Sequence, residues 1–77
     1  MTTRIYTDTR ISIDLCAWNF EQIIQEYMKA IFGTYRVLGG YTMSWDKFET
    51  RSYATRDLPQ VDITIEYKTK SITLTIA

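Results

Sequence analysis

Apolar and polar residues alternate near the start of the chain, from Thr3 to Leu15. The odd positions there include Ile5, Ile11 and Ile13, whereas the even positions are mostly polar or charged. A period of two is that of a half-buried β-strand, but this segment is longer than the usual strand of about five or six residues. We therefore expect a bend or bulge near Asp8, or an N-terminal half that reaches a second subunit.

The end of the chain shows the same alternation, in residues 61–67 and again in residues 72–76. Pairing Tyr67 with Ile72 places the apolar residues of both segments on one face of an antiparallel hairpin. The residues between them lack the Gly or Asn of a tight two-residue turn, so we expect a four-residue loop from Lys68 to Ser71. The sequence therefore predicts a C-terminal β-hairpin, 61–67/72–76.

Between these segments the apolar residues change to the helical period. They recur at spacings of three and four, at Phe20, Ile23, Ile24, Tyr27, Ile31 and Phe32. Asn19 is placed to act as the N-cap of this helix, Gly33 weakens it, and Gly39–Gly40 would stop it. We expect the main helix to run from Asn19 to about Phe32, and the pattern leaves open an extension to Leu38.

Two interpretations compete for residues 41–53. In a helix, the many serine and threonine residues of this segment would be unfavourable. In a hairpin, a turn at 46–47 would set Trp45 opposite Phe48, and both aromatic side chains would complete the core. We favour two strands, about 41–45 and 49–54, which extend the sheet.

Together these elements predict one α+β domain spanning residues 1–77. It would be a two-layer sandwich in which the helix packs on an antiparallel sheet of three to five strands. One helix covers only one face of a sheet, so the opposite face would be open to solvent or to a partner. The alternation assigns to that open face Tyr6, Arg10, Ser12, Thr64, Glu66 and Thr73, of which Tyr6 and Arg10 are candidate contact residues.

Composition limits the chemistry that this domain can perform. The chain has no histidine and a single cysteine, Cys16, so the common zinc ligand sets cannot form. No side chain is suited to general base catalysis near neutral pH, and the carboxylates are scattered singly. We predict that the protein is not an enzyme and holds no cofactor or metal.

Size and compartment can also be argued from the sequence. A 77-residue domain buries only a small core, and Cys16 alone cannot form an internal disulfide, so self-association is the expected source of extra stability. The N-terminus lacks the apolar stretch of a signal peptide, and no apolar run approaches the roughly 20 residues that span a bilayer. We expect a cytoplasmic homo-oligomer that does not enter the membrane.

Basic and aromatic residues are interleaved in the middle of the chain. The candidate partner-binding residues are Arg36, Tyr41, Trp45, Lys47, Phe48, Arg51, Tyr53 and Arg56. Tyr41 and Tyr53 suit an interface because a phenol needs a hydrogen-bond partner. This composition is typical of a protein-binding hot spot, and equally of a surface that binds nucleic acid or nucleotides.

The balance of charge separates these two hypotheses. Nine Lys and Arg residues are matched by nine Asp and Glu residues, whereas nucleic-acid-binding domains usually carry a net positive charge. We therefore favour a small, non-enzymatic protein-interaction module that acts as a regulator or inhibitor by binding another protein. Binding of nucleic acid or a nucleotide through the same residues is the alternative.

Overall fold

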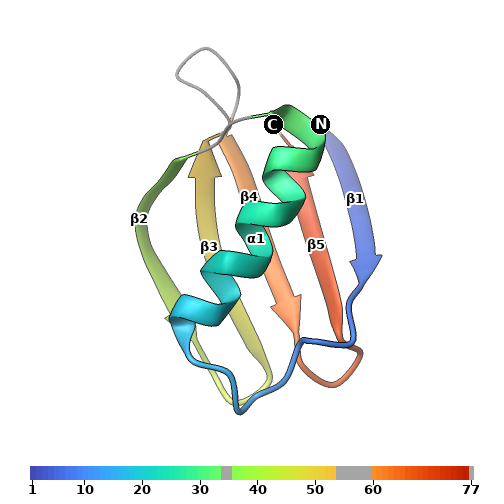
Figure 1. Cartoon of the computed structure of the whole chain (residues 1–77), viewed down its shortest axis with the longest axis vertical. Coiled ribbons are helices and arrows are strands. Elements are labelled where there is room, and N and C mark those ends of the chain that lie inside the picture. Colours follow the sequence, from blue (N-terminus) through green and yellow to red (C-terminus); the bar gives the residue numbers. More distant parts are fainter. Residues whose placement is uncertain (34–35, 54–59, 77) are drawn as a thin grey trace.

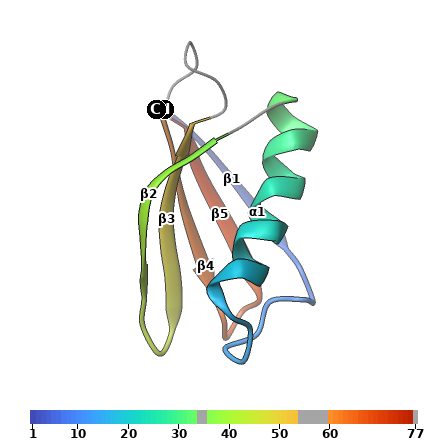
Figure 2. The ribbon, with the colours of Figure 1, turned by 60° about the vertical axis from the view of Figure 1, so that its left-hand side comes forward.

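The computed structural model describes residues 1–33, 36–53 and 60–76, and for residues 36–40 and 53 it describes the backbone alone. The elements are β1 (Thr2–Thr7), α1 (Ala17–Phe32), β2 (Arg36–Met43), β3 (Lys47–Tyr53), β4 (Gln60–Glu66) and β5 (Ser71–Ile76). The strands form a single antiparallel sheet in the order β1-β5-β4-β3-β2. Helix α1 crosses one face of this sheet diagonally (Figures 1 and 2). The predicted two-layer α+β arrangement is confirmed.

The core lies where α1 covers the central strands. Its buried apolar side chains are Ile11, Phe20, Ile23, Ile24, Met28, Phe48, Val61, Ile63, Ile65, Tyr67, Ile72 and Leu74. The ring of Phe20 joins the two layers, with its centroid 4.9 Å from that of Phe48 and 5.6 Å from that of Tyr67. Because each buried apolar side chain contributes about 1.5–3 kcal/mol, most of the stabilisation comes from β3, β4, β5 and the inner side of α1.

The first strand is shorter than the alternation suggested. β1 ends at Thr7, and the chain turns at Asp8, whose carboxylate accepts the backbone N–H of Arg10 at 2.9 Å. Such a side-chain-to-backbone hydrogen bond offers the chain an alternative to the strand ladder. The bend expected near Asp8 is therefore present, but the strand does not resume. Ile11 is buried from a loop and not from a strand.

The helix begins two residues earlier than expected and ends where expected. Cys16, with extended backbone angles, is the N-cap residue, so the assignment of Asn19 as N-cap is wrong. The side-chain oxygen of Asn19 instead accepts the thiol of Cys16 at 2.8 Å. After Phe32 the chain leaves the helix at Gly33, whose φ of +84° is accessible to glycine at little cost. An extension to Leu38 is excluded because β2 occupies that part of the chain.

The middle segment forms a hairpin, as favoured, but its turn is centred differently. Met43 lies opposite Phe48 in the β2–β3 pair, so Ser44 to Asp46 form the turn. Phe48 is buried as expected, whereas Trp45 lies at the tip of the turn with 82% of its surface exposed. The expectation that Trp45 completes the core is therefore wrong. Gly39–Gly40 do not stop a helix but lie within β2, where its register with β3 shifts.

The C-terminal hairpin has the predicted faces in a different register. Ile65, and not Tyr67, lies opposite Ile72, and the four-residue loop is 67–70. The displacement is two residues, and side chains alternate with a period of two, so every apolar residue keeps the face that was predicted for it. The N–H of Tyr67, the first residue of this loop, donates to the carbonyl of Asp46 at 3.2 Å, which ties the loop to the β2–β3 turn.

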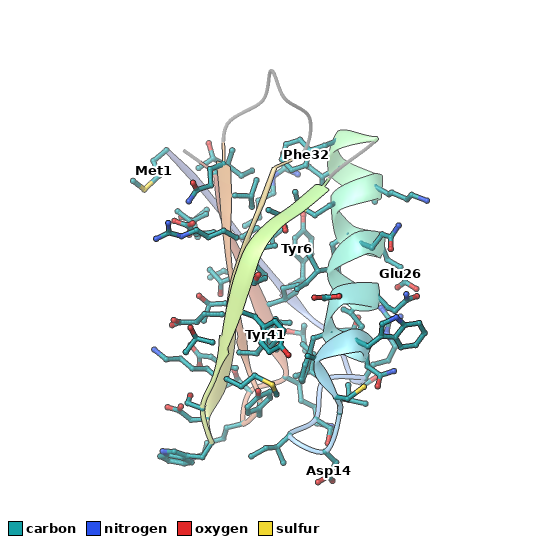
Figure 3. The ribbon with its side chains drawn as sticks, turned by 90° about the vertical axis from the view of Figure 1, so that its left-hand side faces the viewer. Met1, Tyr6, Asp14, Glu26, Phe32 and Tyr41 are labelled. Atoms are coloured by element: carbon teal, nitrogen blue, oxygen red, sulfur yellow. The ribbon has the colours of Figure 1, made fainter. Side chains whose placement is uncertain are left out.

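The assignment of side chains to the two faces of the sheet is wrong for β1. Tyr6 lies on the helix-covered face, where its ring centroid is 5.0 Å from that of Tyr27 (Figure 3). Arg10 follows the end of β1 and lies in the loop, so neither residue belongs to the open face. In β1 it is Ile5 that points to the open face. Side chains of Thr64, Glu66 and Thr73 lie on the open face as expected.

Candidate functional site

Three loops lie together at one end of the molecule, the lower end in Figure 1. They are the β1–α1 loop, the β2–β3 turn and the β4–β5 loop. Their residues line a groove of about 720 Å³. The groove is lined by Ile11, Ser12, Ile13, Trp45, Asp46, Lys47, Glu66, Tyr67, Lys68 and Lys70. This volume falls within the range of small-molecule and peptide-anchor sites in proteins. We call this site the end groove.

The β2–β3 turn holds Trp45 outward in the end groove. The hydroxyl of Ser44 donates to the carboxylate of Asp46 at 2.7 Å, and the N–H of Ser44 donates to the carbonyl of Lys47 at 2.9 Å. These hydrogen bonds close the turn across the residue between them. The position of Trp45 is therefore fixed by the hydrogen bonds of its neighbours in the turn, and not by packing of its own side chain.

The β1–α1 loop supplies an exposed apolar side chain on the same groove. Ile11 is fully buried and fixes the loop against the core, whereas Ile13 has 54% of its surface exposed. The loop is closed by the N–H of Ile11 donating to the carbonyl of Asp8 at 3.2 Å and that of Leu15 donating to Ser12 at 3.1 Å. Ile13 thus lies outward on a loop that is anchored on both sides.

A polar cluster braces this loop against the helix. The guanidinium of Arg10 contacts both carboxylate oxygens of Asp8, the shortest distance being 2.7 Å, and lies 2.6 Å from the carboxylate of Glu26. The hydroxyl of Tyr27 donates to Asp8 at 2.9 Å. Only 9% of the Asp8 side chain is exposed, and its partners satisfy it. We call these four residues the Asp8 cluster.

The Asp8 cluster has a clear electrostatic signature. Hydrogen bonds from the Arg10 side chain hold the pKa of Asp8 well below its usual range, against the opposing effect of burial. The same contact raises the pKa of Arg10, and burial together with the Asp8 hydrogen bond raises the pKa of Tyr27. Both shifts favour the ionised forms of Asp8 and Arg10, and this ion pair positions the loop that carries Ile13.

Tyr67 lines the end groove between the turns. It is almost fully buried, and among the described residues its hydroxyl has no hydrogen-bond partner. Burial, and to a smaller degree the charge of Asp46, raises the pKa of Tyr67. A buried hydroxyl without a partner costs about 1–3 kcal/mol, so the residue is retained at some expense to stability.

Charged side chains surround the apolar part of the end groove without a strong excess of either sign. Lys47 pairs with Glu49 at 3.0 Å, which raises the pKa of Lys47. The ammonium of Lys70 donates to the carbonyl of Thr9 at 3.4 Å. Asp46 and Glu66 oppose these cations. Recognition here would rest on the apolar contacts, with the charges forming a polar rim.

The structure separates the residues that the sequence analysis grouped together. Trp45 and Lys47 lie at the end groove, whereas Phe48 is buried beneath α1 and Tyr41 stacks on it with centroids 5.3 Å apart. Arg51 lies on the open face, 3.6 Å from the carboxylate of Asp62. Arg56 and the side chains of Arg36 and Tyr53 are outside the described residues. Alternation along β3 thus separates Arg51 from the ring of Phe48.

The open face carries a second, smaller hollow of about 460 Å³, lined by Thr42, Glu49, Thr50, Arg51, Asp62, Ile63 and Thr64. Its exposed charged residues include the Arg51–Asp62 pair, and no large exposed apolar side chain is among its lining residues. This hollow lacks the aromatic anchor that distinguishes the end groove.

Sequence reasoning missed Ile13 and Tyr67 as site residues. The alternation assigned Ile13 to a buried strand face, because a bend was expected near Asp8 but the strand was expected to continue beyond it. The sequence did contain one signal: Asp8 is followed by Thr9 and Arg10, polar residues suited to a turn. Tyr67 was treated as part of the hairpin ladder, whereas it lies in the β4–β5 loop, where its N–H donates to the carbonyl of Asp46 in the neighbouring turn.

The described residues offer neither a metal-binding cluster nor a membrane-spanning helix. Across ranges 1–33, 36–53 and 60–76, no group of three or more His, Cys, Asp or Glu side chains could hold a metal ion. No helix in this part of the chain is long and apolar enough to cross a membrane. Comparison of the chain with family models, curated proteins and solved structures finds no match.

Proposed function

We propose that this protein is a small, non-enzymatic protein-interaction module of the cytoplasm, which regulates or inhibits another protein by binding it. In this proposal the end groove receives an apolar side chain of the partner between Trp45 and Ile13. The rim charges of Lys68 and Glu66 orient the partner around that anchor. The proposal includes self-association of the module.

The exposure of Trp45 is the observation that carries the proposal. A tryptophan buries on the order of 150–250 Å² when it is covered, and binding hot spots are enriched in this residue. Trp45 is 82% exposed although the groove that it lines is also lined by two buried residues, Tyr67 and Ile11. Stability of the fold gives no reason for a large apolar side chain at this position, whereas binding does.

The nucleic-acid hypothesis receives less support from the described residues. A stacking platform needs aromatic faces and cations on one accessible surface. Phe48 is buried, and Arg51 is on the other face of the sheet, beside a carboxylate. Trp45 and the lysines of the end groove are the part of the predicted set that could still serve it.

The test compares two exposed tryptophans that differ in position. Trp45 lies in the end groove, whereas Trp18, with 63% of its surface exposed, lies on α1 outside the groove lining. Tagged parent, Trp45→Ala and Trp18→Ala proteins would be used to capture partners from a cytoplasmic extract, with the bound proteins quantified by mass spectrometry. Both variants should stay folded, because each residue is exposed, and thermal unfolding would check this.

We expect a partner that Trp45→Ala captures at least about tenfold less well than the parent, and that Trp18→Ala captures equally well. Equal capture by all three proteins would exclude the end groove as the binding site. An absorbance ratio showing nucleic acid in the bound fraction, lost steeply as salt rises, would overturn the protein-binding proposal in favour of the alternative.

A further inference from the structure

The two edge strands of the sheet differ in how well they could accept another strand. β2 has a register shift against β3 between Val37 and Tyr41, and such irregularities twist an edge away from further pairing. β1 pairs with β5 in one continuous register over all six residues, from Thr2 to Thr7. No described strand pairs with the outer side of β1. The regular edge is therefore the one suited to strand addition.

The hydrogen-bonding groups of that free edge can be assigned. The N–H of Asp8 donates to the carbonyl of Lys70 at 2.8 Å, which continues the β1–β5 ladder. In an antiparallel pair, successive residues direct their N–H and C=O groups to opposite sides of the strand. Tyr6 and the other even residues of β1 therefore bond to β5. The backbone groups of Thr3, Ile5 and Thr7 point away from the sheet.

We infer that a second copy of this chain pairs with β1 in an antiparallel, two-fold arrangement, with Ile5 opposite Ile5 of the second copy. In this register, the three outward residues of each copy all find partners, since Thr3 lies opposite Thr7 of the other copy. Six N–H···O bonds would form across the axis. A displacement of two residues in either direction loses two of these six bonds.

The side chains favour the same register. Ile5 has 68% of its surface exposed on the open face, and in the dimer it covers its own symmetry mate. Arg4 would lie opposite Tyr6 of the second copy, on the helix-covered face. In the alternative register centred on Arg4, two like charges would be directly opposed, which is unfavourable. Each side chain of the edge thus has a compatible partner in the proposed register.

This inference rests on the self-association included in the proposed function and gives it a site. A pairing edge of six residues buries less than the roughly 1,200 Å² of a standard interface, so the dimer should be weak. Sedimentation at about 100 µM is suited to that range. We expect the parent to be dimeric there and the Ile5→Lys variant to dissociate at least about tenfold more readily, because two ammonium groups would face each other.

Ile13→Lys provides the matched control, since Ile13 is also an exposed isoleucine but lies in the end groove. It should remain dimeric and lose partner capture, whereas Ile5→Lys should become monomeric and keep it. A monomeric parent, or a dimer that is unchanged in Ile5→Lys, would overturn the β1 inference. Neither of these outcomes affects the binding test on Trp45, which does not depend on dimer formation through β1.

The register has its own test in a Cys16→Ser background, in which the exposed native thiol is removed. Ile5→Cys should form an intermolecular disulfide on mild oxidation, because directly paired Cα atoms lie about 5.5 Å apart. Thr75→Cys, one strand further in, should not, since three strand spacings of about 4.8 Å separate it from its mate. Failure of Ile5→Cys to cross-link at the concentration of the sedimentation experiment would exclude this register.

Discussion

The two hairpins of the sheet use their apolar residues differently. In β4–β5, alternate residues on the helix side are almost completely buried, among them Val61, Ile63 and Ile72. In β2–β3, Phe48 is buried, but Met43 and Trp45 remain exposed. The first hairpin is central in the sheet and lies beneath α1, whereas the second includes an edge strand (Figures 1 and 2).

The connections of the two hairpins also differ in how strongly they are bonded to other parts of the chain. The β4–β5 loop is tied to the β1–α1 loop, through the backbone of Asp8 and the side chain of Lys70. The β2–β3 turn closes mainly on itself, through Ser44 and Asp46, with one backbone link to Tyr67. A hairpin under a helix is held by burial, whereas a peripheral hairpin can present apolar side chains at little cost to folding. The difference assigns stability to β4–β5 and recognition to the β2–β3 turn.

The largest expected effect is a loss of stability when a buried residue of the β4–β5 hairpin is truncated, compared with a small loss for the β2–β3 hairpin. Ile63→Ala removes buried methylene and methyl groups and should lower the free energy of unfolding by about 2–5 kcal/mol. Met43→Ala, at a partly exposed site of β2, should lower it by less than about 1 kcal/mol. Urea unfolding of the two variants measures both values.

If Ile63→Ala does not fold, Ile63→Val, with an expected loss of about 0.5–1.5 kcal/mol, preserves the comparison. A loss for Met43→Ala equal to that for Ile63→Ala would contradict the division between the hairpins. It would show that the β2 residues belong to the core despite their exposure.

An intermediate effect concerns the Asp8 cluster, which braces the loop beside the β4–β5 turn. Asp8→Asn should lower the free energy of unfolding at pH 7 by about 1–3 kcal/mol, because Arg10 and Tyr27 lose a charged acceptor. The pKa of Asp8 is lower in the folded protein than its unfolded value of about 3.9. Its stabilisation is therefore fully present above that pH and is lost as the pH falls towards the folded pKa.

Urea midpoints of the parent and of Asp8→Asn, measured from pH 7 down to about pH 2, should consequently approach each other as the pH falls below about 3.9. Asp14→Asn, a change to an exposed carboxylate of the same loop, serves as the control and should alter stability little. A difference between parent and Asp8→Asn that stays constant with pH would show that the ionised carboxylate is not what braces the loop.

The smallest expected effect is a gain in stability, and it tests whether the end groove is built for binding at some cost to folding. Tyr67→Phe removes a buried hydroxyl that has no partner among the described residues and should raise the free energy of unfolding by about 1 kcal/mol. Thermal unfolding would detect the gain. A destabilised variant would show that the hydroxyl is hydrogen-bonded in the folded protein. A stabilised variant with weaker partner capture would show that the bound partner uses it.

Hydrophobic periodicity by itself determined the layers of this protein. The stripe that includes Phe20 and Ile24 gave the helix and its end at Phe32, since burial of one helical face requires that spacing. Alternation around Ile63 and Leu74 gave the C-terminal hairpin and its buried face. A register error of two residues leaves each side chain on the same face of the sheet, which is why the buried face was predicted correctly although the register was not.

Tertiary structure alone decided where the chain turns and which apolar residues remain outside. Asp8 ends β1 because Arg10 and Tyr27, the latter from α1, both bond its carboxylate, and Tyr27 lies far along the chain. Trp45 and Phe48 are both large and aromatic, yet only Phe48 lies beneath the helix. Local patterns record how apolar a residue is, but its burial depends on which distant element covers it, and so the end groove emerged only from the folded arrangement.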